Sequence, residues 1–195
     1  TEANKYTEGK TVAEVAKICG EDPFDTFFRL LIEEKSKIQV VVHTQGQEDT
    51  DKVACHPKTC FGSDSMDLST EGLLSIGKPH PRAFGTFGKV FSYYVREKGM
   101  LTFEDAVRKM TYLSAKRLGI DEERGLLKKD YYADIVVFDP DQICDKATYE
   151  DPKQYTVGVE YVLVNGQIAL ENGKQTDVCA GRVIRNPHRF GDQKK

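Results

Sequence analysis

Residues 38–65 read IQVVVHTQGQEDTDKVACHPKTCFGSDS and contain two short apolar runs separated by a polar segment. The run at 38–42 is rich in β-branched residues, which is typical of a strand buried on both faces of a parallel sheet. The run at 59–61 predicts a second, brief strand, and residues 48–54 predict a short helix between the two. Strand, helix and strand in this order predict a compact βαβ unit and an α/β fold class.

Polar residues follow both predicted strands at their carboxyl ends. His43 follows the first strand, and Ser63 and Asp64 follow the second. Ligands of parallel α/β sheets and barrels bind where the strands end, so these positions are candidates for a site. With glycine and serine beside it, the Asp64 carboxylate can approach a reacting atom as a metal ligand or a proton carrier. The alternative is that Asp64 only caps the turn that follows.

The amino-terminal part of the chain predicts two helices. Thr11 and Glu14 form a capping-box pattern, and Gly20 stands where a helix ends in the left-handed conformation. Pro23 opens the second helix at its first position. One face of this second helix is aromatic and is expected to pack in a core; it carries Phe24, Phe27, Phe28 and Leu31.

A long loop and three helices follow the βαβ pattern. Residues 65–85 show no sustained period, and so long a loop inside a compact domain is usually functional. Helical patterns return at 87–95, 102–110 and 114–118. We expect these helices to cover the sheet.

The last third of the chain predicts antiparallel strands. Asn165-Gly166 stands between two alternating apolar runs, which is a strong hairpin signal, and Asn172-Gly173 marks another turn. We therefore expect residues 129–195 to form a small β module distinct from residues 1–128.

Composition excludes several classes of partner. The chain has 195 residues and a formal net charge of −3, so no broad basic field would attract nucleic acid or an anionic membrane surface. No apolar run approaches the roughly 20 residues of a spanning helix, and residues 1–10 do not resemble a signal sequence, so we expect a cytoplasmic location without membrane contact. Five cysteines, an odd number without a C-x-x-C pair, argue against a disulfide framework. Cys55, His56 and Cys60 suggest either a metal clip or unused thiols.

Five strings in order along the chain carry more specific information. They are GSDS at 62–65, GKPHPRAFGTF at 77–87, RKMT at 108–111, YYADIVVFDP at 131–140 and YVLVNG at 161–166. Together they closely resemble the D-aminoacylase group of the amidohydrolase superfamily.

The resemblance implies a fold and an activity. The fold is a (β/α)₈ TIM-type barrel with a small β-sandwich, of which residues 1–128 would supply the last βα units and residues 129–195 the carboxyl-terminal part of the sandwich. The activity is zinc-dependent hydrolysis of N-acyl-D-amino acids to a D-amino acid and a carboxylate. In this reading the chain is a carboxyl-terminal fragment that is inactive alone, and its uncompleted sheets predict a homo-oligomer.

The resemblance also implies roles for individual residues. Asp64 would contact the zinc-bound water, take its proton and pass that proton to the leaving nitrogen. Arg82 offers a fork to a substrate carboxylate, and His80 lies in the same loop; alternatively this segment pins the loop to the barrel. Ser63 and His43 are further substrate-binding candidates. The family's early His-x-His is absent from the chain, so Asp64 is the one metal contact that the sequence predicts.

Two other functions remain open. A cyclic-amide hydrolase of the dihydroorotase or hydantoinase kind would share the barrel ending and the aspartate, and residues 77–82 favour the deacylase over it. A non-catalytic assembly domain would use the barrel remnant only for contact.

Overall fold

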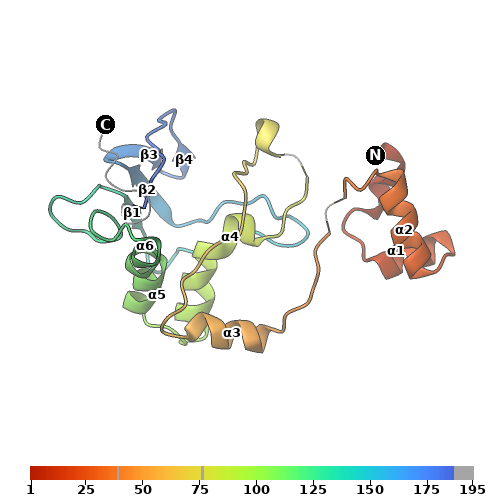
Figure 1. The fold of residues 1–195 in the computed structure, drawn as a ribbon, viewed down its shortest axis with the longest axis horizontal. Coiled ribbons are helices and arrows are strands. Elements are labelled where there is room, and N and C mark those ends of the chain that lie inside the picture. Colours follow the sequence, from red (N-terminus) through yellow and green to blue (C-terminus); the bar gives the residue numbers. More distant parts are fainter. Residues whose placement is uncertain (39, 76, 187–195) are drawn as a thin grey trace.

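The computed structural model describes residues 1–38, 40–75 and 77–186. Figure 1 shows a helical hairpin at one end of the molecule, a small sheet at the other end, and a group of helices between them. No described helix is long and apolar enough to cross a membrane. The cytoplasmic location stays a prediction.

The amino-terminal hairpin begins as predicted. A 3₁₀ helix, η1 (Glu2–Thr7), precedes α1 (Val12–Cys19), whose capping box is complete: the Thr11 side chain accepts from the Glu14 backbone N–H at 3.2 Å, and Glu14 accepts from the Thr11 N–H at 2.8 Å. α1 ends at Gly20 with φ of 68°. Pro23 opens α2 (Pro23–Glu33).

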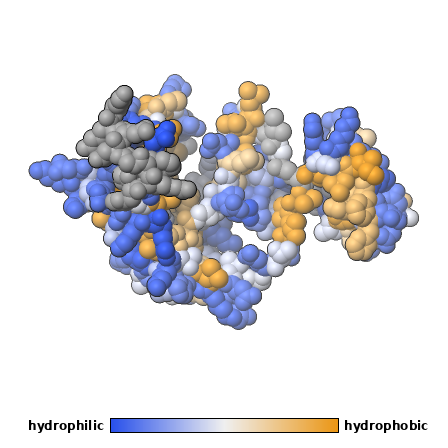
Figure 2. Space-filling view, in the orientation of Figure 1, coloured by the Kyte–Doolittle hydropathy of each residue, from blue (hydrophilic) through white to orange (hydrophobic). Residues whose placement is uncertain are grey.

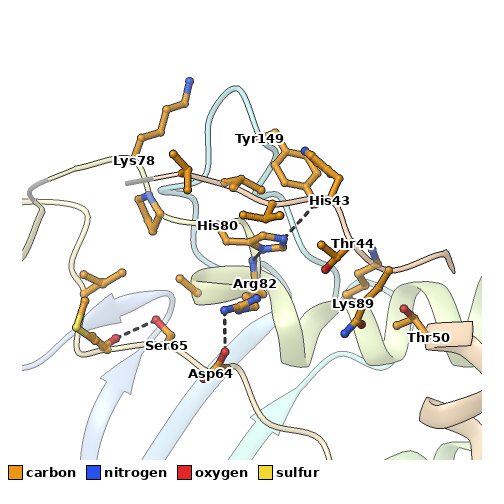
Figure 3. A pocket seen from close by; sticks show the side chains of 18 of the residues that line it. His43, Thr44, Thr50, Asp64, Ser65, Lys78, His80, Arg82, Lys89 and Tyr149 are labelled. Carbon is orange, nitrogen blue, oxygen red and sulfur yellow. Dashed lines mark hydrogen bonds and ion pairs between the residues drawn. The ribbon is translucent and has the colours of Figure 1, made fainter. Parts of the chain in front are cut away.

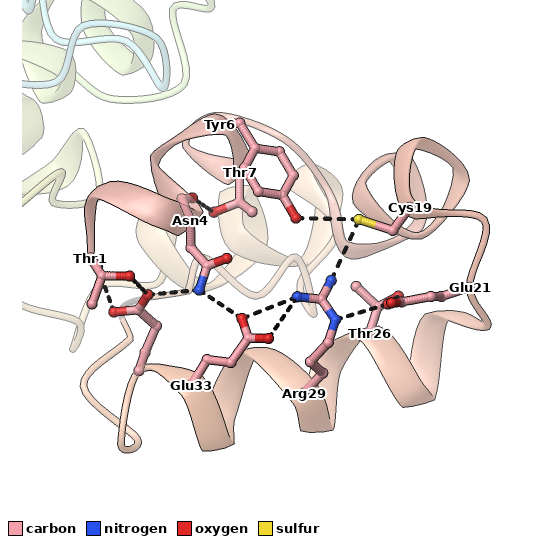
Figure 4. A network of polar contacts seen from close by, with 10 residues as sticks. Thr1, Asn4, Tyr6, Thr7, Cys19, Glu21, Thr26, Arg29 and Glu33 are labelled. Carbon is pink, nitrogen blue, oxygen red and sulfur yellow. Dashed lines mark hydrogen bonds and ion pairs between the residues drawn. The ribbon is translucent and has the colours of Figure 1, made fainter.

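Polar contacts hold α2 against the preceding segments (Figure 4). Arg29 pairs with Glu21 at 3.0 Å and with Glu33 at 3.1 Å, and the buried Asn4 donates to Glu33 at 2.9 Å. The hydrogen bond from Asn4, followed by that from Arg29, lowers the pKa of Glu33. This network stabilises the hairpin. Thr26 and Leu30 are the buried residues of α2.

The expectation that the aromatic face of α2 packs in a core is wrong. Phe24 is 76% exposed, and Phe27 and Phe28 are exposed as well. Figure 2 shows this apolar surface on the hairpin. The physical reason is that α2 has two apolar sides, and only the side facing α1 has a partner among the described residues.

Of the predicted βαβ unit, only the helix forms. It is α3 (Gln47–Cys55). The described residues of 38–42 and residues 59–61 adopt no strand, and the former run as an extended segment between the hairpin and α3 (Figure 1). Val42 in that segment is 67% exposed. A parallel strand takes its hydrogen bonds from neighbouring strands, and the described chain supplies none for either run.

The middle helices form the core. After the 3₁₀ turn η2 (Gly72–Ser75), α4 (Arg82–Lys89) continues directly into the π-helix η3 (Val90–Glu97). α5 (Phe103–Met110), capped by Thr102, and α6 (Tyr112–Leu118), ended by Gly119, follow as predicted. The helices do not cover a parallel sheet; η3 and α5 instead pack around a shared core. That core contains Val90, Phe91, Ala106 and Ile143.

Gly88 lets the chain after the first strand approach these helices. A Cβ at Gly88 would lie 2.8 Å from the Asp145 backbone nitrogen and 2.8 Å from the Thr156 side chain. Only glycine fits this contact without a shift of the backbone. Residues 143–156 are thereby held against α4.

The antiparallel sheet matches the prediction. β1 (Ile135–Phe138), β2 (Val159–Val164), β3 (Gln167–Glu171) and β4 (Lys174–Gln175) pair in sequence order. Asn165 and Gly166 have φ of 49° and 79°, which is the left-handed pair that a tight hairpin requires. The described chain thus has α/β content with a small antiparallel sheet and no parallel one.

One buried arginine connects the helices to the sheet. Arg124 donates to the Asn165 side chain at 2.7 Å and pairs with Asp134, and its guanidinium lies 4.2 Å from the Tyr132 ring centroid. Phe138 and Val159 of the sheet also pack on the helical core. The division of the chain into 1–128 and 129–195 stays a prediction.

Candidate active site

A hollow of about 790 Å³ opens beside the start of α4 (Figure 3). Segments far apart in the sequence line it. They are residues 40–45, Gln47, Thr50, residues 64–66, Leu68, residues 78–80, residues 82–83, Lys89 and Tyr149. The hollow therefore contains most of the residues that the sequence indicated as a site.

Asp64 and Arg82 meet in this hollow. The Nη2 of Arg82 donates to the Oδ2 of Asp64 at 2.7 Å. The Asp64 side chain is 86% exposed and the Arg82 side chain 47% exposed, so water and a ligand can reach both. The backbone of Asp64 has φ of 49°, a left-handed conformation that aspartate tolerates better than most residues.

A buried lysine fixes the chain that leads to Asp64. Lys109 of α5 has no exposed surface, and its Nζ donates to the carbonyls of Ala54 at 2.9 Å, Thr59 at 3.2 Å and His56. Burial lowers the pKa of Lys109. The ammonium group thus caps the end of α3 and holds the segment that precedes Asp64.

His80 is oriented by two hydrogen bonds. Its Nδ1 accepts from the Arg82 backbone N–H at 3.1 Å, and its Nε2 lies 3.1 Å from the Tyr149 hydroxyl. Burial is the main cause that lowers the pKa of His80, and electrostatic interactions with Arg82, His43 and Lys89 add to it. A neutral imidazole is favoured.

Tyr149 is the residue of this site that sequence reasoning missed. Its ring lies 5.1 Å from that of His80 and 5.3 Å from that of His43, between centroids (Figure 3). Tyr149 stands 69 positions after His80, in a stretch without a recognisable motif. Only the fold of residues 143–156 against α4 places it here, so no local pattern could have indicated it.

The remaining candidate residues differ in placement. His43 lines the hollow, whereas Ser63 is not among the lining residues. The neighbouring Ser65 does line it, and its hydroxyl donates to the Met66 carbonyl at 3.0 Å. A substrate-binding role for Ser63 stays a prediction.

The described residues do not fit a zinc ion. In the part of the chain that the structure describes, no three His, Cys, Asp or Glu side chains gather into a possible ligand set. Cys55, His56 and Cys60 therefore do not form the metal clip that their spacing suggested. Asp64 is a single carboxylate already paired with Arg82. A catalytic zinc needs three protein ligands, so the described chain alone cannot hold one in that way.

The family assignment follows from comparison with known proteins. A model described as the amidohydrolase family matches residues 6–170. This chain belongs to the amidohydrolase family. The fold of this superfamily is a TIM barrel.

Three similar proteins illustrate which members of the family this chain resembles. N-acyl-D-aspartate deacylase of Alcaligenes xylosoxydans xylosoxydans is 41% identical over 138 residues, covering 71% of this chain and 26% of that protein. A crystal structure of D-aminoacylase matches with a TM-score of 0.77 and 33% identity, covering 94% of this chain and 36% of that one. N-acyl-D-glutamate deacylase from Bordetella bronchiseptica, in complex with zinc and a phosphonate inhibitor, matches with a TM-score of 0.69 and 33% identity, covering 85% and 32%.

This chain covers only part of the relatives that it matches. It spans 34% and 33% of the length of two curated relatives while about nine-tenths of its own length is matched. The family resemblance that the sequence indicated is confirmed.

Proposed function

We propose that this chain is part of an enzyme that hydrolyses N-acyl-D-amino acids to a D-amino acid and a carboxylate. The observation that carries the proposal is the pairing of Asp64 with Arg82 in an open hollow. The names of the relatives support the substrate class, since they are deacylases or aminoacylases of D-amino acids.

Arg82 is the proposed anchor for the substrate. Its guanidinium is partly exposed and can turn one edge of its fork from Asp64 to the α-carboxylate of an N-acyl amino acid. The amide bond of the substrate would then lie near Asp64. His80 supports this arrangement by accepting the backbone N–H of Arg82.

Asp64 is the proposed proton carrier. Once Arg82 binds the substrate, the carboxylate is free to accept a proton from the water that attacks the amide carbonyl carbon. The bond from carbon to nitrogen then breaks, and Asp64 returns the proton to the leaving nitrogen. Bond formation and proton transfer balance without a further reactant.

The complete enzyme is proposed to depend on zinc, which would polarise the amide carbonyl and lower the pKa of the attacking water. The Bordetella bronchiseptica relative was solved with zinc, but the described residues of this chain do not assemble a ligand set for it. The roles proposed above are confined to Arg82 and Asp64. A cytoplasmic homo-oligomer remains part of the proposal.

The test is substrate turnover by the complete protein to which this chain belongs. N-acetyl-D-methionine and N-acetyl-D-glutamate should be hydrolysed, whereas their L-enantiomers should not. Hydrolysis of dihydroorotate or a hydantoin instead would favour the cyclic-amide hydrolase, and no turnover of either class would favour an assembly domain.

A further inference from the structure

Residues 145–156 form a compact loop that extends from the sheet past α4 (Figure 1). Its two ends are joined, because Cys144 and Val157 exchange backbone hydrogen bonds of 3.3 Å and 3.0 Å. Inside the loop, Thr148 and Asp151 also form two hydrogen bonds, of 2.9 Å and 3.0 Å. Surface loops of about 6–16 residues with their ends close together are frequently functional.

Hydrogen bonds fix this compact loop to α4 and η3. The Ser92 hydroxyl donates to the Oδ1 of Asp145 at 2.7 Å. At the other end, the Thr156 hydroxyl donates to the Phe84 carbonyl at 3.2 Å. The compact loop is therefore held in place relative to the helix that begins with Arg82.

Two side chains of the compact loop reach the long loop between Asp64 and α4. The Nζ of Lys153 donates to the Ser75 carbonyl. The Tyr155 hydroxyl accepts from the Thr70 N–H at 3.4 Å. Both contacts are made to backbone groups, so they hold the main chain of the long loop on each side of the turn at residues 72–74.

The long loop forms part of the wall of the hollow but has little packing of its own. Leu73 in η2 is 89% exposed and Leu74 is 56% exposed, so apolar burial contributes little to holding this loop. The contacts from the compact loop therefore matter for its position. The lining residues that the long loop supplies are Ser65, Met66, Leu68, Lys78, Pro79 and His80.

We propose that Lys153 and Tyr155 are positioning residues, which hold the long loop in the conformation that forms the substrate-facing wall. The inference rests on the proposed function. Neither residue lines the hollow, so each acts on the substrate only through the loop. A wall that is already in place spares the substrate the entropy cost of ordering it.

Hydrolysis kinetics of the complete protein test the positioning role. Loss of one such hydrogen bond corresponds to roughly threefold to tenfold in binding. We therefore expect Lys153→Met and Tyr155→Phe each to raise KM for N-acetyl-D-methionine by about that factor, with kcat within about twofold of the wild type. Tyr155→Phe keeps the ring that lies 5.5 Å from the Phe84 ring, between centroids, so this variant is expected to fold.

Two matched substitutions serve as controls. Lys146→Met changes an exposed lysine of the same compact loop, and Tyr161→Phe removes a hydroxyl from β2, outside the hollow. Neither should change KM. A merely structural role of Lys153 and Tyr155 would lower the amount of folded enzyme and hence the apparent kcat without raising KM.

NMR order parameters of this chain test the contact without any turnover. Backbone order parameters are about 0.85 in rigid segments and below about 0.6 in flexible ones. In the double variant of Lys153→Met and Tyr155→Phe we expect those of residues 66–75 to fall toward the flexible value, while those of β2 and β3 stay unchanged.

The two measurements separate this inference from the proposed function. Unchanged order parameters in the long loop, or an unchanged KM in both variants, would overturn the inference. If the complete protein hydrolyses no N-acyl-D-amino acid while the long loop loosens as expected, the proposed function fails and the structural role of Lys153 and Tyr155 stands.

Discussion

The Nη2 of Arg82 lies 2.7 Å from the Oδ2 of Asp64, and this contact joins the two side chains on which the proposed chemistry depends. Asp64 follows the segment that Lys109 holds, and Arg82 is the first residue of α4. In the proposed reaction substrate binding and proton transfer would therefore be coupled, because Arg82 would exchange partners before Asp64 accepts a proton.

Removal of Arg82 should affect stability little. Both partners of the Asp64–Arg82 pair are largely exposed, and exposed ion pairs contribute about 0–1 kcal/mol. We expect Arg82→Ala to lower the free energy of unfolding by less than about 1 kcal/mol, measured by urea denaturation. A loss above about 2 kcal/mol would mean that the arginine mainly pins the loop.

Removal of the Lys109 ammonium should affect stability strongly. Lys109→Met keeps most of the buried volume but leaves three backbone carbonyls without their donor. We expect a loss of about 2–4 kcal/mol in the free energy of unfolding. Lys116→Met, which changes an exposed lysine near the Tyr112 ring, should cost no more than about 0.5 kcal/mol. Equal effects of the two substitutions would show that the hydrogen bonds of Lys109 do not stabilise the fold.

Acid should weaken the fold through His80. Because burial and the nearby cations lower its pKa in the folded state, the unfolded chain binds this proton more readily. The contribution of neutral His80 is fully present above about pH 6.5 and declines as the pH falls toward the lower folded value. His80→Asn keeps an acceptor for the Arg82 N–H but cannot titrate. Urea midpoints at pH 8 and pH 5 should therefore fall less in the variant than in the wild type, and equal falls would exclude His80 as the cause.

Local signals in the sequence predicted local structure well. The capping box at Thr11 and Glu14, the helix end at Gly20 and the hairpin at Asn165-Gly166 each depend on residues within a few positions of one another, and all are confirmed. The strands at 38–42 and 59–61 were predicted wrongly because a strand also needs neighbours, which local pattern does not reveal.

The site was predictable only in part, for a related reason. Asp64, His80, Arg82 and His43 were indicated by motif or by position after a predicted strand, and the structure brings all four to one hollow. Tyr149 reaches that hollow through long-range packing. The string at 108–111 was recognised, but the buried hydrogen bonds of Lys109 were not foreseeable from it.

Exposed apolar surface predicts self-association of this chain. Phe24 and Phe28 on α2 and Val42 in the extended segment are exposed, and burying such surface is favourable by roughly 25 cal/mol per Å². We expect light scattering at micromolar concentration to report a dimer or a larger species. Phe24→Ser combined with Phe28→Ser should shift the population toward the monomer. A monodisperse wild-type monomer would contradict this expectation.

This chain alone should show no deacylase activity. The described residues do not assemble the three ligands of a catalytic zinc site, although the hollow can still bind substrate weakly. Purified chain incubated with N-acetyl-D-methionine should therefore release no D-methionine above the buffer blank. Turnover that a chelator abolishes would contradict the prediction.

Hydrolysis kinetics of Asp64→Asn in the complete protein decide whether Asp64 carries the proton. The amide keeps nearly the shape of the carboxylate but cannot accept a proton from water, and general acid–base catalysis is typically worth about 10²-fold or more. The proposal predicts that kcat for an N-acyl-D-amino acid falls by at least about that factor while KM changes much less. A variant that keeps more than about a tenth of the wild-type kcat would contradict the role of Asp64.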